Sequence, residues 1–225
     1  MRLADVEVAA FGDSAVLVNV AGPEAARALG ASIRSDPPPG VTGSVPALDT
    51  VLVSFDPLVT DADAVRGAVM ARASATVTSP DGRLRMIPVA YGGEHGPDLG
   101  DVARLSGLSA DAVVEMHATT ELRVFFDGFA PGFAYLGELP EAIRVPRLAT
   151  PRTRTPRGSV AIAAAMSGVY PADLPGGWRV IGRTPLQLFD PLRDPPAYLL
   201  PGDRVRFMPI AEDEWEQHER PRADW

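Results

Sequence analysis

The chain has 225 residues, no cysteine and a formal net charge of −8 at pH 7, and 46% of its residues are hydrophobic, as in an ordinary globular protein. The absence of cysteine excludes thiol nucleophiles, disulfides and cysteine-ligated metal sites. All 21 basic residues are arginines, which excludes a Walker A loop and Schiff-base chemistry, because both need a lysine.

The charge and hydropathy patterns predict no binding to nucleic acid or to membranes. An acidic protein lacks the basic footprint of a nucleic-acid binder, and no apolar run approaches the roughly 20 residues that cross a bilayer. Residues 1–5 contain an early acid and no apolar core, so we expect no signal peptide and a cytoplasmic protein. One local exception is a basic island from Arg144 to Arg157, which suits a small anion or an acidic partner.

The first third of the sequence alternates between strand and helix patterns. Strands are predicted at 6–11, 15–20, 50–55 and 84–89. A helix is expected to begin near Pro23, and a second one after an N-cap at Thr60 or Asp61. This order predicts a small α+β domain over residues 1–83, with helices on one face of a mostly antiparallel sheet.

The segment 98–118 predicts two short helices joined near Gly107, with Ser109 as the second N-cap. Such a pair is also the pattern of a DNA-binding helix-turn-helix. Its second helix carries Asp111 and Glu115 and no arginine, so we expect a structural hairpin of helices instead.

Short strand patterns separated by proline- and glycine-rich turns fill the rest of the chain. They lie at 122–126, 159–163, 178–181, 186–189 and 204–208, and this spacing predicts a barrel or sandwich. We therefore expect a mostly-β domain over residues 84–211. Residues 212–225 are rich in acids and predict a tail that forms a solvated helix or a mobile end.

Three ordered blocks carry a family resemblance. They are GFAPGFAYLGELP at 128–140, PRLATPRTRTPRGSVAIA at 146–163 and SGVYPADLPGGWRVIGRTPLQLFDP at 167–191. These blocks resemble the signatures of the KipI-like family, also called allophanate hydrolase subunit 1, which includes the PxpB component of ATP-dependent 5-oxoprolinase. IPVAYGG at 87–93 and PGDRVRFMPI at 201–210 also resemble that family, so the resemblance covers essentially the whole chain.

The resemblance implies an N-terminal α+β domain and a C-terminal cyclophilin-like β-barrel. It also implies a subunit, inactive alone, of an amidohydrolase complex with a KipA-like (PxpC) and a LamB/YcsF-like (PxpA) partner. That complex uses ATP to open a small amide, 5-oxoproline, to glutamate, although this chain shows no nucleotide-binding motif. Two alternatives stay open: a KipI-like inhibitor of a sporulation-type histidine kinase, and an accessory subunit of a urea carboxylase or allophanate hydrolase system.

Two elements of the blocks predict an anion site. Arg152 and Arg154 are two residues apart in a proline-stiffened extended segment, so both guanidinium groups should project from one face as a fork for an anion. The alternative is an interface strand that meets acids of a partner. The Gly176-Gly177 turn leaves backbone N–H groups open to developing negative charge, and Arg183 follows one strand later. We expect all of them at one mouth of the barrel.

Aromatic side chains complete the candidate substrate site. Phe133 and Tyr135 alternate with glycines in the first block, as in the wall of a pocket or in a tight barrel corner. Tyr170 precedes the glycine turn and could line the same mouth. The three histidines lack metal-ligand spacing, so we predict no metal site and recognise no catalytic residue. Met166 stands where many relatives carry glutamine, which puts the exact substrate in doubt.

Overall fold

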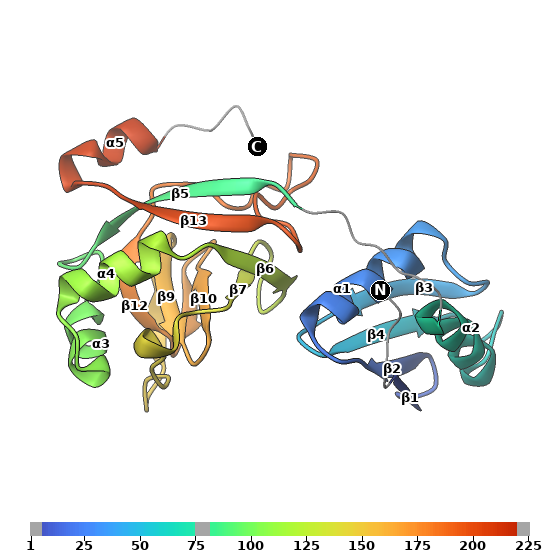
Figure 1. Cartoon of the computed structure of the whole chain (residues 1–225). Helices are drawn as coiled ribbons and strands as arrows, with labels where there is room; N and C mark the ends of the chain where they lie inside the picture. The colour runs from blue at the N-terminus through green and yellow to red at the C-terminus, as the bar shows by residue number, and fades with distance from the viewer. Residues whose placement is uncertain (1–5, 75–81, 220–225) are drawn as a thin grey trace. The chain divides into compact units, whose positions relative to one another are not determined.

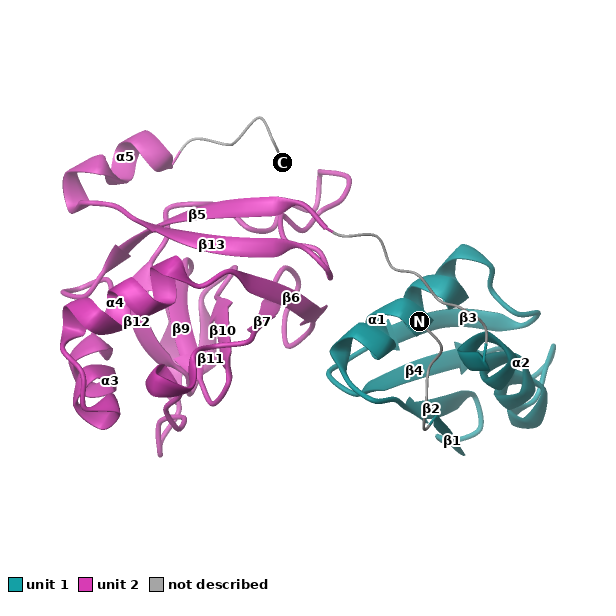
Figure 2. Ribbon diagram, viewed as in Figure 1, with its two compact units in different colours: residues 1–81 teal, residues 82–225 magenta. Residues whose placement is uncertain are grey.

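The computed structural model describes residues 6–74 and 82–219, and the chain divides into two compact units, Met1–Asp81 and Gly82–Trp225 (Figure 2). Residues 1–5, which bear on the signal peptide, and the end of the tail at 220–225 lie outside the described residues. None of the described helices is long and apolar enough to span a membrane.

Unit 1 is a four-stranded antiparallel sheet with two helices (Figure 1). Its elements are β1 (Glu7–Ala10), β2 (Ala15–Asn19), α1 (Pro23–Ser35), β3 (Val41–Pro46), β4 (Thr50–Phe55) and α2 (Ala62–Ser74). The spatial order of the strands is β1-β2-β4-β3. The sequence did not predict β3, which is an edge strand with a mostly exposed face and a terminal proline.

The core of unit 1 follows from alternation in the two central strands. Val16 and Val18 of β2 and Val53 of β4 are fully or almost fully buried against apolar residues of the two helices, such as Leu29. Asp61 caps α2, since its Oδ1 accepts a hydrogen bond from the Ala64 N–H at 2.9 Å.

Unit 2 contains a closed seven-stranded barrel, which confirms the predicted barrel. Its strands are β5 (Leu84–Tyr91), β6 (Leu122–Asp127), β7 (Ala134–Gly137), β9 (Ser159–Ala163), β10 (Met166–Val169), β12 (Arg179–Arg183) and β13 (Arg204–Pro209). Neighbours run in the order β10-β7-β6-β13-β5-β12-β9, with β5 and β13 parallel and side by side in Figure 1. Alternate residues such as Val160 and Ile162 fill the main core.

Two helices pack against the barrel as the predicted hairpin. α3 (Leu99–Ser106) ends at Gly107, which has a left-handed φ of 68°, and α4 (Ala110–Thr119) begins after Ser109, whose side chain caps the Ala112 N–H. α4 lies on β13 and carries His117 into the core. The hairpin is therefore part of the barrel domain's packing.

Two expectations for unit 2 differ from the structure. Residues 186–189 form no strand, only one isolated bridge between Phe189 and Ala197, because this segment leaves the barrel after β12. The acidic tail forms η2 (Glu212–Glu214) and α5 (Trp215–His218), and it is not wholly solvated, because the Trp215 ring stacks on His95 at a centroid distance of 4.8 Å. A further short helix, η1 (Glu141–Ile143), precedes the basic island.

Candidate functional site

The Arg-rich segment and the glycine turn form one two-stranded ribbon. β8 (Arg152–Thr155) pairs antiparallel with β11 (Leu174–Gly176), so that Arg152 lies opposite Gly176 and Thr155 opposite Leu174. A methyl group at Gly176 would collide with the hydroxyl of Tyr170. Glycine is therefore required at this point, and it lets the ribbon lie directly on the tyrosine.

Tyr170 is buried beneath the end of the ribbon that carries Gly176 and Gly177, called the glycine end below. Its side chain is 2% exposed. Burial raises the pKa of its phenol, against the opposing effects of the Trp178 backbone N–H and the nearby cation of Arg147. The hydroxyl is accordingly protonated at neutral pH and available as a hydrogen-bond donor.

Arg152 does not present an open guanidinium group. Its Nη1 and Nη2 donate to the two carboxylate oxygens of Asp98 at 2.8 and 2.6 Å, and Asp98 Oδ2 also accepts from the Val180 N–H at 2.7 Å. Asp98 is 5% exposed. Arg152 thus fastens the ribbon to the start of α3 and to β12, in a bidentate pair.

Arg154 pairs with a different carboxylate. Its Nε donates to Asp173 Oδ2 at 2.8 Å, and Asp173 Oδ1 accepts from the Arg157 N–H at 2.8 Å. These contacts, first the Arg157 N–H and then Arg154, lower the pKa of Asp173. The predicted fork is therefore wrong as a geometry, because each arginine is held by its own aspartate.

The predicted aromatic residues divide into a buried and a half-exposed member. Phe133 is 2% exposed and meets Tyr135, Tyr170 and Trp178 edge to face at centroid distances of 5.0, 5.3 and 5.7 Å. It therefore supports the wall from within rather than forming its surface. Tyr135 keeps part of its ring exposed. Phe129, which was not predicted, is 57% exposed with a φ of 67°.

One arginine of the basic island stands free at the glycine end. Arg147 is exposed and has no ion-pair partner among residues 6–74 and 82–219. A Cβ at Gly177 would lie 3.8 Å from its Nε. The open guanidinium group of Arg147 suits the anionic group of a small ligand, and the glycine turn and the half-exposed phenol of Tyr135 suit a planar ring attached to it.

Arg183 lies at the other end of the ribbon. Its Nε donates to the Arg157 carbonyl at 2.8 Å, and both residues line a polar cleft of about 360 Å³ with His95 and Trp215. Neither glycine of the turn lines this cleft. Arg152 and Gly176 thus lie opposite each other in the ribbon, whereas Arg183 lies apart from the glycine turn, so the prediction of a single mouth is wrong for Arg183.

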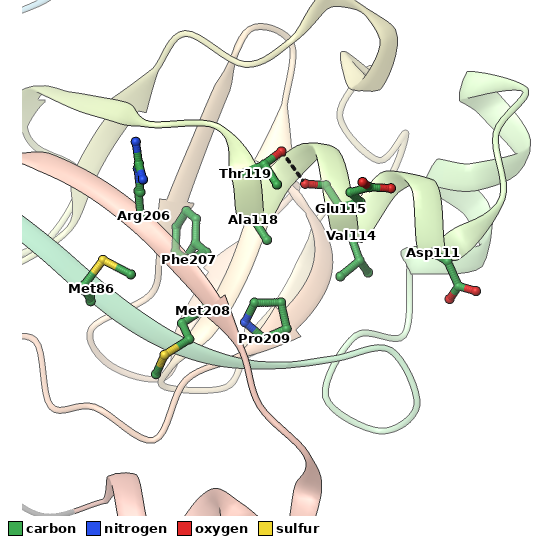
Figure 3. Close-up of a pocket in the computed structure, with 10 residues that line it drawn as sticks. All are labelled: Met86, Asp111, Val114, Glu115, Ala118, Thr119, Arg206, Phe207, Met208 and Pro209. Carbon is green, nitrogen blue, oxygen red and sulfur yellow. Dashed lines mark hydrogen bonds between the residues drawn. The ribbon is translucent and has the colours of Figure 1, made fainter.

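A second hollow is an apolar groove of about 670 Å³ between α4 and β13 (Figure 3). Its apolar lining includes Met86, Val114 and Met208, while Asp111 and Arg206 are exposed at its rim. None of the predicted site residues lines it. We therefore assign the candidate site to the ribbon and not to this groove.

Comparison with known proteins identifies the family. Residues 6–199 match the family model for the carboxyltransferase domain, subdomains C and D. The chain is 46% identical to the B subunit of 5-oxoprolinase from Escherichia coli O157:H7 over 77% of its length and 80% of the relative. It is 36% identical to the Bacillus subtilis (strain 168) protein of the same name, over 93% of its length and 95% of the relative. This chain belongs to the family of 5-oxoprolinase B subunits.

Solved structures show where the same fold occurs. The crystal structure of TTHA0988 matches with a TM-score of 0.77 and 34% identity over 88% of this chain, which spans only 40% of that longer chain. PH0987 from Pyrococcus horikoshii matches with a TM-score of 0.58 and 41% identity over 93% of this chain and 100% of its own. The urea amidolyase of K. lactis shares the fold, with a TM-score of 0.78 at 18% identity over 96% of this chain and 16% of its own.

Two ionisable groups, the fully buried His117 and the half-buried Asp127, have shifted pKa values in the structure. His117 is fully buried, contacts the Tyr91 hydroxyl at 2.7 Å and the Ser167 hydroxyl at 2.9 Å, and burial lowers its pKa to about 3. Burial, and then the charge of Asp203, raise the pKa of Asp127 to about 7. His117 is therefore a neutral core residue, whereas Asp127 exchanges a proton near neutral pH.

Asp127 gives a pH-dependent stability prediction. The folded carboxyl keeps its proton up to about pH 7, whereas the unfolded one loses it near pH 3.8, so this group destabilises the fold progressively as the pH rises between them. Asp127→Asn removes that penalty. We expect it to raise the free energy of unfolding relative to the parent by up to about 1.4 kcal/mol per pH unit from pH 4 to pH 7. Denaturant titrations at pH 4.5, 5.5 and 6.5 measure the difference, and a constant difference would contradict the assignment.

Proposed function

We propose that this chain is the B subunit of a 5-oxoprolinase complex that uses ATP to open 5-oxoproline to glutamate. The observation that carries the proposal is the near full-length similarity to two proteins of that name, at 46% and 36% identity. The complex would contain a KipA-like (PxpC) and a LamB/YcsF-like (PxpA) subunit. Since this chain is an accessory part of the complex, we expect it to be inactive alone.

The chemistry of the proposed reaction assigns two tasks. The terminal phosphoryl group of ATP moves to the amide oxygen of 5-oxoproline and releases ADP, and water then attacks the activated carbon. The ring C–N bond breaks, the nitrogen takes up a proton and an acyl phosphate remains, and a second water molecule hydrolyses this acyl phosphate to glutamate and inorganic phosphate. The partners would supply the ATP site, while this chain would help to hold the anionic substrate in place.

The glycine end of the ribbon is the part of this chain that suits that task. Arg147 would receive the substrate carboxylate, and Tyr135 and the N–H groups of Gly176-Gly177 would orient the amide ring; the exposure of Arg147 and its position beside Gly177 support these roles. Arg152, paired with Asp98, would hold the ribbon in position rather than touch substrate.

A second candidate function is an accessory role in urea or allophanate breakdown. Urea amidolyase of Lachancea kluyveri is 36% identical, but over only 28% of this chain and 4% of its own length. A third is inhibition of a histidine kinase, as the KipI name of the family suggests. Among the relatives described above, none that supports either of these functions covers as much of this chain as the 5-oxoprolinase B subunits do.

A substrate panel tests the proposal. The chain is mixed with its two partner subunits and ATP, and ADP release is followed with 5-oxoproline, urea or allophanate. We expect release with 5-oxoproline, together with an equal amount of glutamate. Release with urea or allophanate alone would assign the second function instead. Inhibition of a histidine kinase by the chain, without turnover of any amide, would assign the third.

A further inference from the structure

The cleft at the far end of the ribbon brings two arginines together on rigid backbone. Arg183 ends β12, where it pairs with Ser159 of β9 and Ala90 of β5. The Thr184 N–H donates to the Gly158 carbonyl at 2.9 Å, which holds Arg157 beside Arg183. Gly158 has a φ of 83°, and a methyl group there would collide with the Thr184 carbonyl. The backbone that carries the two arginines is thus fixed by the strand pairing of the barrel.

Neither of these cations is neutralised within the part of the chain that the structure describes. Arg183 donates its Nε–H to the Arg157 carbonyl, and neither guanidinium group has a carboxylate within ion-pair distance there. Asp173 is a neighbouring acid, and it already accepts from the Arg157 N–H and from Arg154. Two adjacent like charges repel each other, and an anion between the two guanidinium groups would relieve this repulsion.

His95 adds a third donor to the same cleft. Its Nε2 is shielded from solvent and makes no hydrogen bond in the structure, and the carboxylate oxygen Oε1 of Glu212 lies 3.8 Å away. The His95 ring stacks on Trp215, and the Trp215 ring in turn lies 5.6 Å from the Arg183 guanidinium carbon. The short helix of the tail therefore forms one wall of the cleft, held by aromatic contacts.

We propose that Arg157, Arg183 and His95 form a second anion site of this protein, which binds a phosphoryl group. Two guanidinium groups and an imidazole N–H surround a space of about 360 Å³, and three donors match the terminal oxygens of a phosphate better than a planar carboxylate. Three acids of the tail, Glu212, Glu216 and Glu219, line the same cleft and compete with the ligand. Inorganic phosphate and the terminal phosphate of a nucleotide share this chemistry.

Calorimetric titration of the isolated full chain tests the site, independently of any turnover. The titrants are inorganic phosphate and ADP, with acetate as the carboxylate control, all at one ionic strength set with chloride. We expect saturable binding of phosphate or ADP and none of acetate. Tighter binding of ADP identifies a nucleotide, and tighter binding of free phosphate identifies the ion. Absence of saturable binding of both would overturn the proposal.

Substitutions locate the binding. Arg157→Gln, whose side chain is exposed, is expected to weaken phosphate binding about tenfold or more, because a charge-assisted hydrogen bond is lost. Glu212→Gln should strengthen binding a few fold, as a competing charge is removed. Arg66→Gln, on α2 of unit 1, is the matched control and should change nothing. Arg183→Gln is a less decisive variant, because Arg183 lies in a barrel strand and its replacement could unfold the chain. Unchanged phosphate affinity in a folded Arg157→Gln variant would therefore refute the site on its own.

Discussion

Replacing Arg152 by alanine is expected to lower the free energy of unfolding by about 3 kcal/mol, because it leaves a buried carboxylate without its cation. Asp98 is 5% exposed. Once the two hydrogen bonds from the Arg152 guanidinium group are lost, its carboxylate still accepts one from the Val180 N–H. Denaturant unfolding followed by circular dichroism measures the loss. Arg152→Ala should also reduce activity of the complex, but only to the extent that the ribbon is displaced.

Arg154→Ala is the matched control for this prediction. Arg154 is 75% exposed in its ion pair with Asp173, and solvent screens an exposed pair of this kind, so its loss should cost far less stability than the loss of Arg152. Asp98→Asn combined with Arg152→Ala should cost less than the sum of the two single changes, since one pair is being broken. Equal effects of Arg152→Ala and Arg154→Ala would show that the buried pair does not hold the ribbon.

Replacing Arg147 by alanine is expected to lower kcat/KM for 5-oxoproline in the assembled complex by about tenfold to a hundredfold. A charged hydrogen bond to a substrate carboxylate contributes roughly 1.5–3 kcal/mol. Stability should hardly change, because Arg147 is exposed and has no ion-pair partner among the described residues. Steady-state kinetics and the unfolding midpoint of the chain together measure both effects.

Two comparisons make the Arg147 test specific. Arg147→Lys keeps the charge and should recover part of the loss, since a lysine binds a carboxylate through one point rather than a fork. Arg104→Ala removes another exposed arginine, on α3, which is 68% exposed beside Asp101, and should leave turnover unchanged. Full activity of a complex built with Arg147→Ala would remove Arg147 from the proposed site.

Local patterns predicted the elements with strong periodicity. The run Thr50–Phe55 forms β4 with the predicted limits, and Asp61, Gly107 and Ser109 act at helix ends as expected. Short strands such as β10 were missed, because four residues with an internal glycine carry no clear alternation. Residues 186–189 were assigned wrongly as a strand, since an apolar run alone does not show whether a neighbour is available for pairing.

Side-chain partners distant in sequence limited the prediction of the site. The extended spacing placed Arg152 and Arg154 correctly in one strand, β8. No local sequence feature indicates that Arg152 pairs with Asp98, 54 positions earlier, or that Arg154 pairs with Asp173. Arg147, the free arginine at the glycine end of the ribbon, is visible in sequence only as one member of a basic island. Which cation remains open is decided by tertiary contacts and not by residue type.

The proposed function makes this chain a required subunit of an ATP-driven 5-oxoprolinase. The most direct measurement keeps the two partner subunits and ATP constant, increases the concentration of this chain, and follows ADP release with and without 5-oxoproline. The account predicts no 5-oxoproline-dependent release at zero chain, and a rise that saturates when the chain reaches a fixed ratio to its partners. Full activity of the partners without the chain, or no activity at any ratio, would contradict it.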